Sequence, residues 1–103
     1  MARFRISAVL SLCCLVWCVV ALPEWTWISG NDTINSKGVY DSKGTPSINS
    51  YPGARRGAVG WFDSENQQLW VFGGYGYDSS GTESYLNDLW RYQVNDSTWT
   101  WMS

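Results

Sequence analysis

Two short segments of this chain almost repeat each other, and both alternate tryptophan with threonine. The first is Trp25-Thr26-Trp27 and the second is Trp99-Thr100-Trp101, near the end of the chain. An alternation with a period of two places the indole rings on one face of a strand and the threonine on the other. Repetition of one strand pattern at two distant places indicates an array of similar β units. The 8 Trp and 6 Tyr among 103 residues also favour β structure over helix.

Residues 1–21 have the pattern of a secretory signal peptide, with a basic start followed by a long apolar run. Val19 and Ala21 supply the small residues that precede a cleavage site, so we expect cleavage after Ala21. The alternative is an uncleaved anchor that attaches the chain to a membrane, because the apolar run is long for a signal peptide. We therefore predict that residues 22–103 form a secreted or extracellular segment.

The leader contains all three cysteines of the chain, Cys13, Cys14 and Cys18. If it is removed, the remaining segment has no thiol and can form neither a disulfide nor a cysteine-ligated metal site. A short domain without disulfides needs stabilisation from outside the chain. The formal net charge of −2 gives no electrostatic footprint for nucleic acid, and we interpret Arg55-Arg56 as a solvated strand edge.

After the leader, the chain divides into one strand, one long loop and four further strands. Residues 24–29 form the first strand. Residues 30–53 are rich in Asn, Ser and Gly without sustained alternation, which is typical of a loop, and only Val39-Tyr40 has the character of a short strand. Four strand-like runs separated by turn signals follow, as in an antiparallel meander. They span residues 56–62, 69–72, 86–94 and 98–102.

The motifs in the second half of the chain come in a characteristic order. The apolar run 69–72 ends at Gly73-Gly74, and Tyr92 and Trp99 follow with six residues between them. This arrangement resembles a kelch repeat, the unit of the β-propeller family that includes galactose oxidase and kelch-like proteins. In this family such glycines let strands converge, and such aromatic residues pack between neighbouring blades. The resemblance therefore implies structural roles for Gly73, Gly74, Tyr92 and Trp99.

The same resemblance implies an all-β fold. We expect residues 54–103 to form one four-stranded antiparallel propeller blade, preceded by residues 24–29 as an N-terminal outer strand. In a complete ring, this outer strand would complete the last blade and hide the open sheet edge. The chain would then be a fragment of a larger β-propeller. Because radial arrays need about three or more repeats for stability, we expect no stable monomer of the chain alone.

The sequence contains no constellation of catalytic or metal-binding residues. It has no histidine, and its cysteines lie in the leader, so the copper ligands of galactose oxidase are lacking. We interpret the acidic side chains as solvated, mostly in turns, and expect Asp88 to point outward from its strand. These acidic residues are Asp63, Glu65, Asp78, Glu83 and Asp88. We therefore predict no catalytic residue, no metal ligand and no bound cofactor.

Tyrosines in the predicted loops are the best candidates for contact with a partner. Residues 30–53 and 75–85 are rich in turn-forming residues, and long loops of repeat arrays project from one face. In the second loop, Tyr75, Tyr77 and Asp78 form a candidate binding patch, because tyrosine combines rigid apolar area with a polar tip. We predict a non-catalytic module that binds a protein partner and not nucleic acid. The alternatives are a carbohydrate-binding or carbohydrate-active propeller and a truncated product without independent function.

Two sequons for N-linked glycosylation occur after the leader. They are Asn31-Asp32-Thr33 and Asn95-Asp96-Ser97, and both fall in predicted surface turns. A secreted chain would meet the glycosylation machinery, so Asn31 and Asn95 are candidate attachment sites for a glycan. The site that contains threonine is the better candidate.

Overall fold

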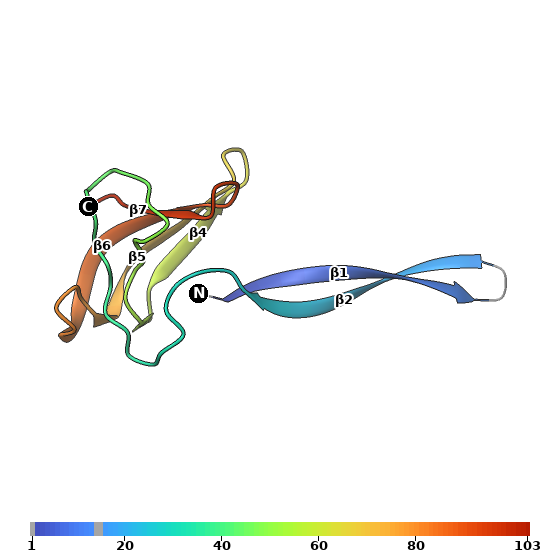
Figure 1. The fold of residues 1–103 in the computed structure, drawn as a ribbon, viewed down its shortest axis with the longest axis horizontal. Coiled ribbons are helices and arrows are strands. Elements are labelled where there is room, and N and C mark those ends of the chain that lie inside the picture. The colour runs from blue at the N-terminus through green and yellow to red at the C-terminus, as the bar shows by residue number, and fades with distance from the viewer. Residues whose placement is uncertain (1, 14–15) are drawn as a thin grey trace.

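The computed structural model describes the backbone of residues 2–13 and 16–103 and the side chains from Pro23 onward. This described part consists of strands, turns and loops without a helix, which confirms the predicted all-β fold. It accordingly contains no helix that is long and apolar enough to cross a membrane. The strands in Figure 1 are β1 (Ala2–Cys13), β2 (Val16–Trp27), β3 (Arg55–Arg56), β4 (Val59–Asp63), β5 (Gln68–Tyr77), β6 (Glu83–Gln93) and β7 (Thr98–Trp101).

β1 and β2 form a two-stranded antiparallel hairpin that projects from the rest of the molecule (Figure 1). The described residues of the predicted signal peptide, 2–13 and 16–21, lie in these two strands. Its side chains lie outside the described residues, so the signal peptide stays a prediction. Trp25 and Trp27 of the predicted outer strand also lie in β2, where they pair with Phe4 and Ala2 of β1. The first Trp-Thr-Trp segment therefore pairs with the leader and not with the larger sheet.

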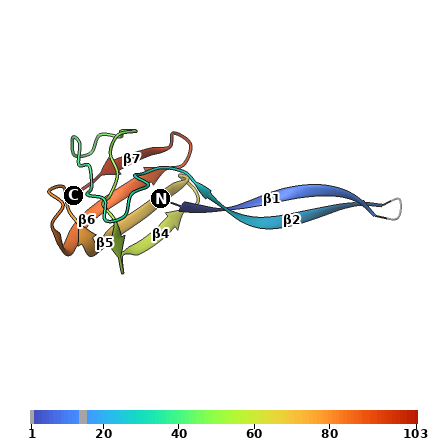
Figure 2. The same ribbon diagram turned by 60° about the horizontal axis from the view of Figure 1, so that its bottom comes forward.

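The remaining strands form one antiparallel sheet, which we call the main sheet. Its order is β3-β5-β6-β7, and β4 pairs with β5 on the same side as β3. β3 and β4 are thus two pieces of one edge strand, interrupted at Gly57 and Ala58. Consecutive strands are neighbours, so the sheet is a meander four strands wide (Figure 2). This arrangement confirms the four-stranded antiparallel unit predicted for the second half of the chain.

β5 continues through the double glycine and ends only at Tyr77. Its register against β6 shifts between Phe72 and Gly74, which marks a β-bulge. Gly73 and Gly74 have φ values of 63° and 98°, and a Cβ on Gly74 would lie 2.8 Å from the carbonyl oxygen of Arg56. Glycine is needed here because a side chain would be both strained and too close to the neighbouring backbone.

The prediction of a loop over residues 75–85 is therefore wrong in extent. β5 and β6 remain paired as far as Tyr77 and Glu83, which leaves only a short turn between the two strands. The glycine-rich sequence favours a loop when it is considered alone. In the structure, Gly76 instead allows close packing within a strand, because a Cβ there would lie 2.1 Å from the carbonyl oxygen of Ala54.

Three aromatic side chains on one side of β6 and β7 form the buried core. Trp90 is 0% exposed, and Tyr92 and Trp99 are each 2% exposed. Tyr40 and Tyr51, from the long segment between β2 and β3, pack against these rings. We call this side of the main sheet the covered face.

The long segment agrees with the predicted loop over residues 30–53, because it contains only isolated β-bridges. One of these bridges, between Ser47 and Trp99, lies at the edge of the main sheet that β7 forms. The backbone N–H of Ser47 donates to the carbonyl oxygen of Trp99 at 2.9 Å, and that of Gly44 donates to Trp101 at 2.7 Å. The loop thus covers part of the edge that β7 would otherwise expose.

Candidate functional site

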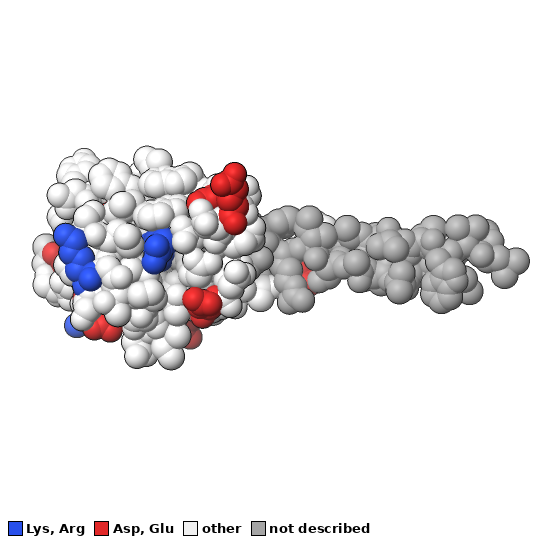
Figure 3. Space-filling view, turned by 90° about the horizontal axis from the view of Figure 1, so that it is seen from above, with Lys and Arg blue, Asp and Glu red and all other residues white. Residues whose placement is uncertain are grey.

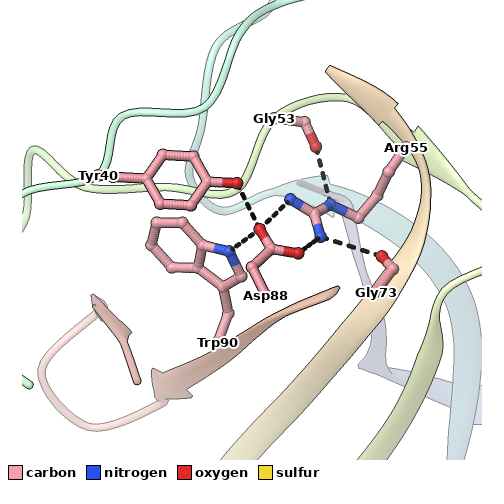
Figure 4. A network of polar contacts seen from close by, with 6 residues as sticks. All are labelled: Tyr40, Gly53, Arg55, Gly73, Asp88 and Trp90. Atoms are coloured by element: carbon pink, nitrogen blue, oxygen red, sulfur yellow. Dashed lines mark hydrogen bonds and ion pairs between the residues drawn. The ribbon is translucent and has the colours of Figure 1, made fainter. Parts of the chain in front are cut away.

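A buried network of polar side chains connects the long loop to the main sheet (Figure 4). At its centre, Asp88 of β6 accepts two hydrogen bonds from Arg55 of β3, at 2.6 Å to Oδ1 and 2.8 Å to Oδ2. Trp90 donates its indole N–H to Asp88 Oδ2 at 2.7 Å, and the Tyr40 hydroxyl donates to the same oxygen. The side chains of Arg55 and Asp88 are 7% and 9% exposed, so they form a buried ion pair.

Arg55 also holds two stretches of backbone in place. Its Nε donates to the carbonyl oxygen of Gly53 at 3.1 Å, and its Nη1 donates to that of Gly73 at 3.0 Å. The guanidinium therefore connects the end of the long loop, the bulge in β5 and the middle of β6. Both oxygens of Asp88 are engaged by donors, so this carboxylate is a structural anchor and not a free base.

The environment of this network sets the charge of its members. Burial raises the pKa of Tyr40 to about 12, and the hydrogen bond to Asp88 adds to this effect. Burial also opposes ionisation of Asp88, but its three hydrogen-bond donors outweigh burial and lower its pKa below the ordinary value. Near pH 7 the network therefore holds a charged carboxylate, a charged guanidinium and a neutral phenol.

The network corrects two predictions. The prediction that Asp88 points outward is wrong, because strand alternation places it on the covered face with Trp90 and Tyr92. The prediction of a solvated edge at Arg55 is also wrong, whereas the next residue, Arg56, is exposed. Sequence analysis missed the pair, although one signal was present. An acidic residue two positions before a buried tryptophan shares its face and therefore needs a buried cation.

The opposite side of the main sheet carries exposed apolar residues. Cross-strand pairing aligns Val59 with Phe72 and Leu89, and it aligns Trp61 with Trp70. We call these five residues the open face. Val59 is 60% exposed, Trp61 46% and Phe72 44%. The rings of Trp61 and Trp70 stack in parallel, with centroids 5.9 Å apart and 2° between their planes. An exposed apolar surface of this kind usually marks a contact with another protein surface.

Beyond the bulge, Arg56, Tyr75 and Tyr85 pair across β3, β5 and β6. The Arg56 guanidinium lies 5.0 Å from the centre of the Tyr75 ring, and the Tyr75 and Tyr85 rings meet edge to face at 5.0 Å. Tyr85 is 88% exposed. These three residues line an open hollow of about 780 Å³, which we call the tyrosine hollow.

The predicted binding patch is divided between two elements. Tyr75 and Tyr77 lie in β5 and are partly buried, while Asp78 begins the turn that follows. Asp78 accepts a hydrogen bond from the hydroxyl of Ser80 and from the backbone N–H groups of Ser80 and Thr82, and these bonds lower its pKa. Asp78 therefore stabilises the turn, and of the patch only Tyr75 contributes to the tyrosine hollow.

The residues with predicted structural roles lie in the core and in the bulge. Tyr92 and Trp99 pair across β6 and β7, and their ring centroids are 5.0 Å apart. Gly73 and Gly74 form the bulge that Arg55 holds from the side. The structure thus brings the two aromatic residues together, and it places the two glycines at a point where only glycine fits.

Both predicted glycan sites are exposed. Asn31 lies in the loop after β2, and Asn95 lies in the turn between β6 and β7. The part of the chain with described side chains contains no group of three or more His, Cys, Asp or Glu residues that could hold a metal ion. On the face shown in Figure 3, basic and acidic side chains are separated on a mainly uncharged surface.

Comparisons with protein-family models, curated proteins and solved structures find no match. The function must therefore be argued from the geometry of the open face, the tyrosine hollow and the buried network.

Proposed function

We propose that this chain belongs to an extracytoplasmic kelch-type β-propeller that acts as a protein-interaction module. The observation that carries the proposal is the open face. Val59, Trp61 and Phe72 form an apolar surface on a four-stranded meander, and they remain exposed among the residues whose side chains the structure describes. Sheets with one apolar face are stable when that face packs against another layer, and radial repetition of such sheets is one solution.

The covered face supports the same proposal. The long loop shields the aromatic core on β6 and β7, but Phe62 of β4 remains 53% exposed. Apolar residues are therefore exposed on both sides of the sheet at β4 and β5. A propeller blade has such surfaces because a neighbouring blade packs against each of its faces. The bulge at Gly73-Gly74 and the pair of Tyr92 and Trp99 agree with the kelch pattern.

The protein partner would contact the exposed ends of the sheet. We assign this role to the long loop, residues 30–53, and to Tyr85 beside the turn after β5. A leader of the signal-peptide type and two sequons on exposed turns support location outside the cytoplasm and a glycoprotein. If the leader is not cleaved, the module would be membrane-anchored.

The second candidate function is carbohydrate binding, and the tyrosine hollow is the observation that favours it. Tyr75 and Tyr85 present aromatic rings beside the Arg56 guanidinium in an open hollow. Aromatic rings bind the apolar faces of sugars, and a guanidinium supplies hydrogen-bond donors. If this function holds, Tyr85→Ala should abolish binding of oligosaccharides in a glycan array. Binding of a protein partner should lose only one contact from the same substitution.

The open face can be tested through self-association of the purified chain. Exposed aromatic sheet surfaces should make the wild-type chain associate, which sedimentation velocity measures directly. We expect Trp61→Glu to weaken this association by about tenfold or more, because it puts a charge on the apolar contact.

The matched control is Ile48→Glu, because Ile48 is 77% exposed but lies in the long loop and outside the open face. This control should associate as strongly as the wild type. A wild-type chain that sediments as a stable monomer would contradict the proposal, as would equal effects of the two substitutions.

A further inference from the structure

The two sequons differ in local geometry. The Oδ1 atom of Asn31 accepts hydrogen bonds from the backbone N–H of Thr33 at 2.8 Å and from the Thr33 hydroxyl at 2.6 Å. Both residues are exposed, and these bonds engage the side-chain oxygen of Asn31 and not its amide nitrogen, which is the atom that carries a glycan. Asn95 instead lies in the four-residue turn between β6 and β7, where Ser97 has a φ of 55°. That turn is already constrained by the pairing of its two strands.

A hollow of about 310 Å³ lies directly beside Asn31. Trp27, Tyr51 and Trp99 supply aromatic walls, and Asn31 and Thr33 lie at the polar part of the lining. Trp27 is 54% exposed, so part of its indole surface is free to contact a group at the mouth of the hollow. Its volume is at the lower end of the range for small-ligand sites, about 300–1,000 Å³.

The segment that carries Trp27 and Asn31 is fixed to the main sheet. Ile28 packs against the aromatic core, and Trp99 donates its indole N–H to Ser29 Oγ at 3.2 Å. These two contacts lie between Trp27 and Asn31 in the chain and do not involve β1. Removal of the leader would take away the pairing of Trp27 with Ala2, but it would leave these two contacts beside Trp27 in place.

We propose that Asn31 carries an N-linked glycan whose first sugar packs against Trp27 at the mouth of this hollow, and that Asn95 is not modified. The inference deepens the proposed extracytoplasmic function and rests on it. A bond forms between the amide nitrogen of Asn31 and the anomeric carbon of a lipid-pyrophosphate-linked oligosaccharide. The bond from that carbon to the pyrophosphate breaks, the lipid pyrophosphate leaves, and the amide nitrogen gives up one proton. The apolar face of the sugar ring then covers indole surface that is otherwise exposed to water.

Occupancy is tested by expressing the full chain in a secretory eukaryotic cell and treating it with a peptide N-glycanase. We expect one glycan on the wild-type chain, seen as a single shift in gel mobility. Thr33→Ala should abolish this shift, and Ser97→Ala should leave it unchanged. Retention of the shift in Thr33→Ala, or its loss in Ser97→Ala, would overturn the assignment.

A second version, in which a foreign signal peptide replaces residues 1–21, separates this inference from the proposed location. If only this version is glycosylated, the native leader does not direct secretion, and the location is wrong while the site at Asn31 stands. If neither version is glycosylated, the site at Asn31 is refuted.

The packing of the first sugar against Trp27 is tested by the rate at which the glycanase removes the glycan from the native chain. We expect Trp27→Ala to raise this rate by about fivefold, the factor that corresponds to about 1 kcal/mol of aromatic contact. Trp25→Ala is the matched control, because it removes the same side chain two residues away and outside the hollow. Equal rates for the wild type and Trp27→Ala, or equal acceleration by both substitutions, would show that the sugar does not pack against Trp27.

Discussion

Arg55 and Asp88 form a buried ion pair whose contribution depends on the presence of both partners. The pair stands beside Trp90, and Tyr40 reaches it from the long loop. A charge without its partner at this position would be buried and uncompensated, which costs more than the pair contributes. Single side chains therefore decide whether the loop stays attached to the sheet.

Replacing Asp88 with alanine should destabilise the fold strongly. We expect Asp88→Ala to lower the free energy of unfolding by about 3–5 kcal/mol, because Arg55 would remain buried without a counter-charge. Denaturant unfolding followed by tryptophan fluorescence measures this change. Asp41→Ala, at an exposed position in the same loop as Tyr40, should cost less than about 0.5 kcal/mol. Equal effects of the two substitutions would show that the ion pair does not anchor the loop.

At the scale of elements, the bulge in β5 determines how the sheet is built. It shifts the register between Phe72 and Gly74, and it lets β5 pair with both pieces of the edge strand. The backbone of β3 approaches so closely at Gly74 that no Cβ fits. The double glycine is therefore a requirement of strand packing and not the end of a strand.

Gly74→Ala should destabilise the sheet more than Gly81→Ala. Both glycines have positive φ, 98° and 85°, so alanine introduces backbone strain of about 1–2 kcal/mol at either position. At Gly74 a Cβ would also lie 2.8 Å from the carbonyl oxygen of Arg56, whereas at Gly81 no heavy atom lies within 4 Å. The difference between the two unfolding free energies, measured with denaturant, isolates the cost of the close approach. A difference of zero would mean that β3 can move away from β5.

At the scale of the whole molecule, the main sheet has a core on one side and an open face on the other. Only three hydrophobic side chains, Trp90, Tyr92 and Trp99, are buried among the described residues. A core of this size gives little stabilisation, because the hydrophobic contribution scales with the apolar area removed from water. We therefore expect contacts made by the open face to contribute further stabilisation.

The unfolding temperature of the chain should therefore rise with its concentration. Association through the open face stabilises the folded state by mass action, since the unfolded chain lacks this surface. Differential scanning fluorimetry over a hundredfold range of concentration, about 1–100 µM, measures the dependence. A constant unfolding temperature over this range would indicate that the single sheet is stable without a partner.

Several features could be predicted from the sequence because they depend on local pattern. Alternation around Trp99 and the turn-forming residues between the apolar runs were sufficient for the all-β fold and the antiparallel meander. The resemblance drew attention to Tyr92 and Trp99, which the structure pairs in the core. The kelch identity, the secretion and the protein partner stay predictions.

Other features depend on contacts between distant residues, and the local pattern gave the wrong answer for them. Gly76 belongs to a strand because the backbone of Ala54 packs against it, although its neighbours in the sequence favour a loop. Asp88 is buried because Arg55, far away in the chain, supplies the counter-charge. The amino-acid sequence by itself determined the order and the central parts of the strands in the second half of the chain, because strand propensity and alternation are local properties. Only the tertiary structure decided which face is covered and which charges are buried, because burial depends on segments that meet in space after folding.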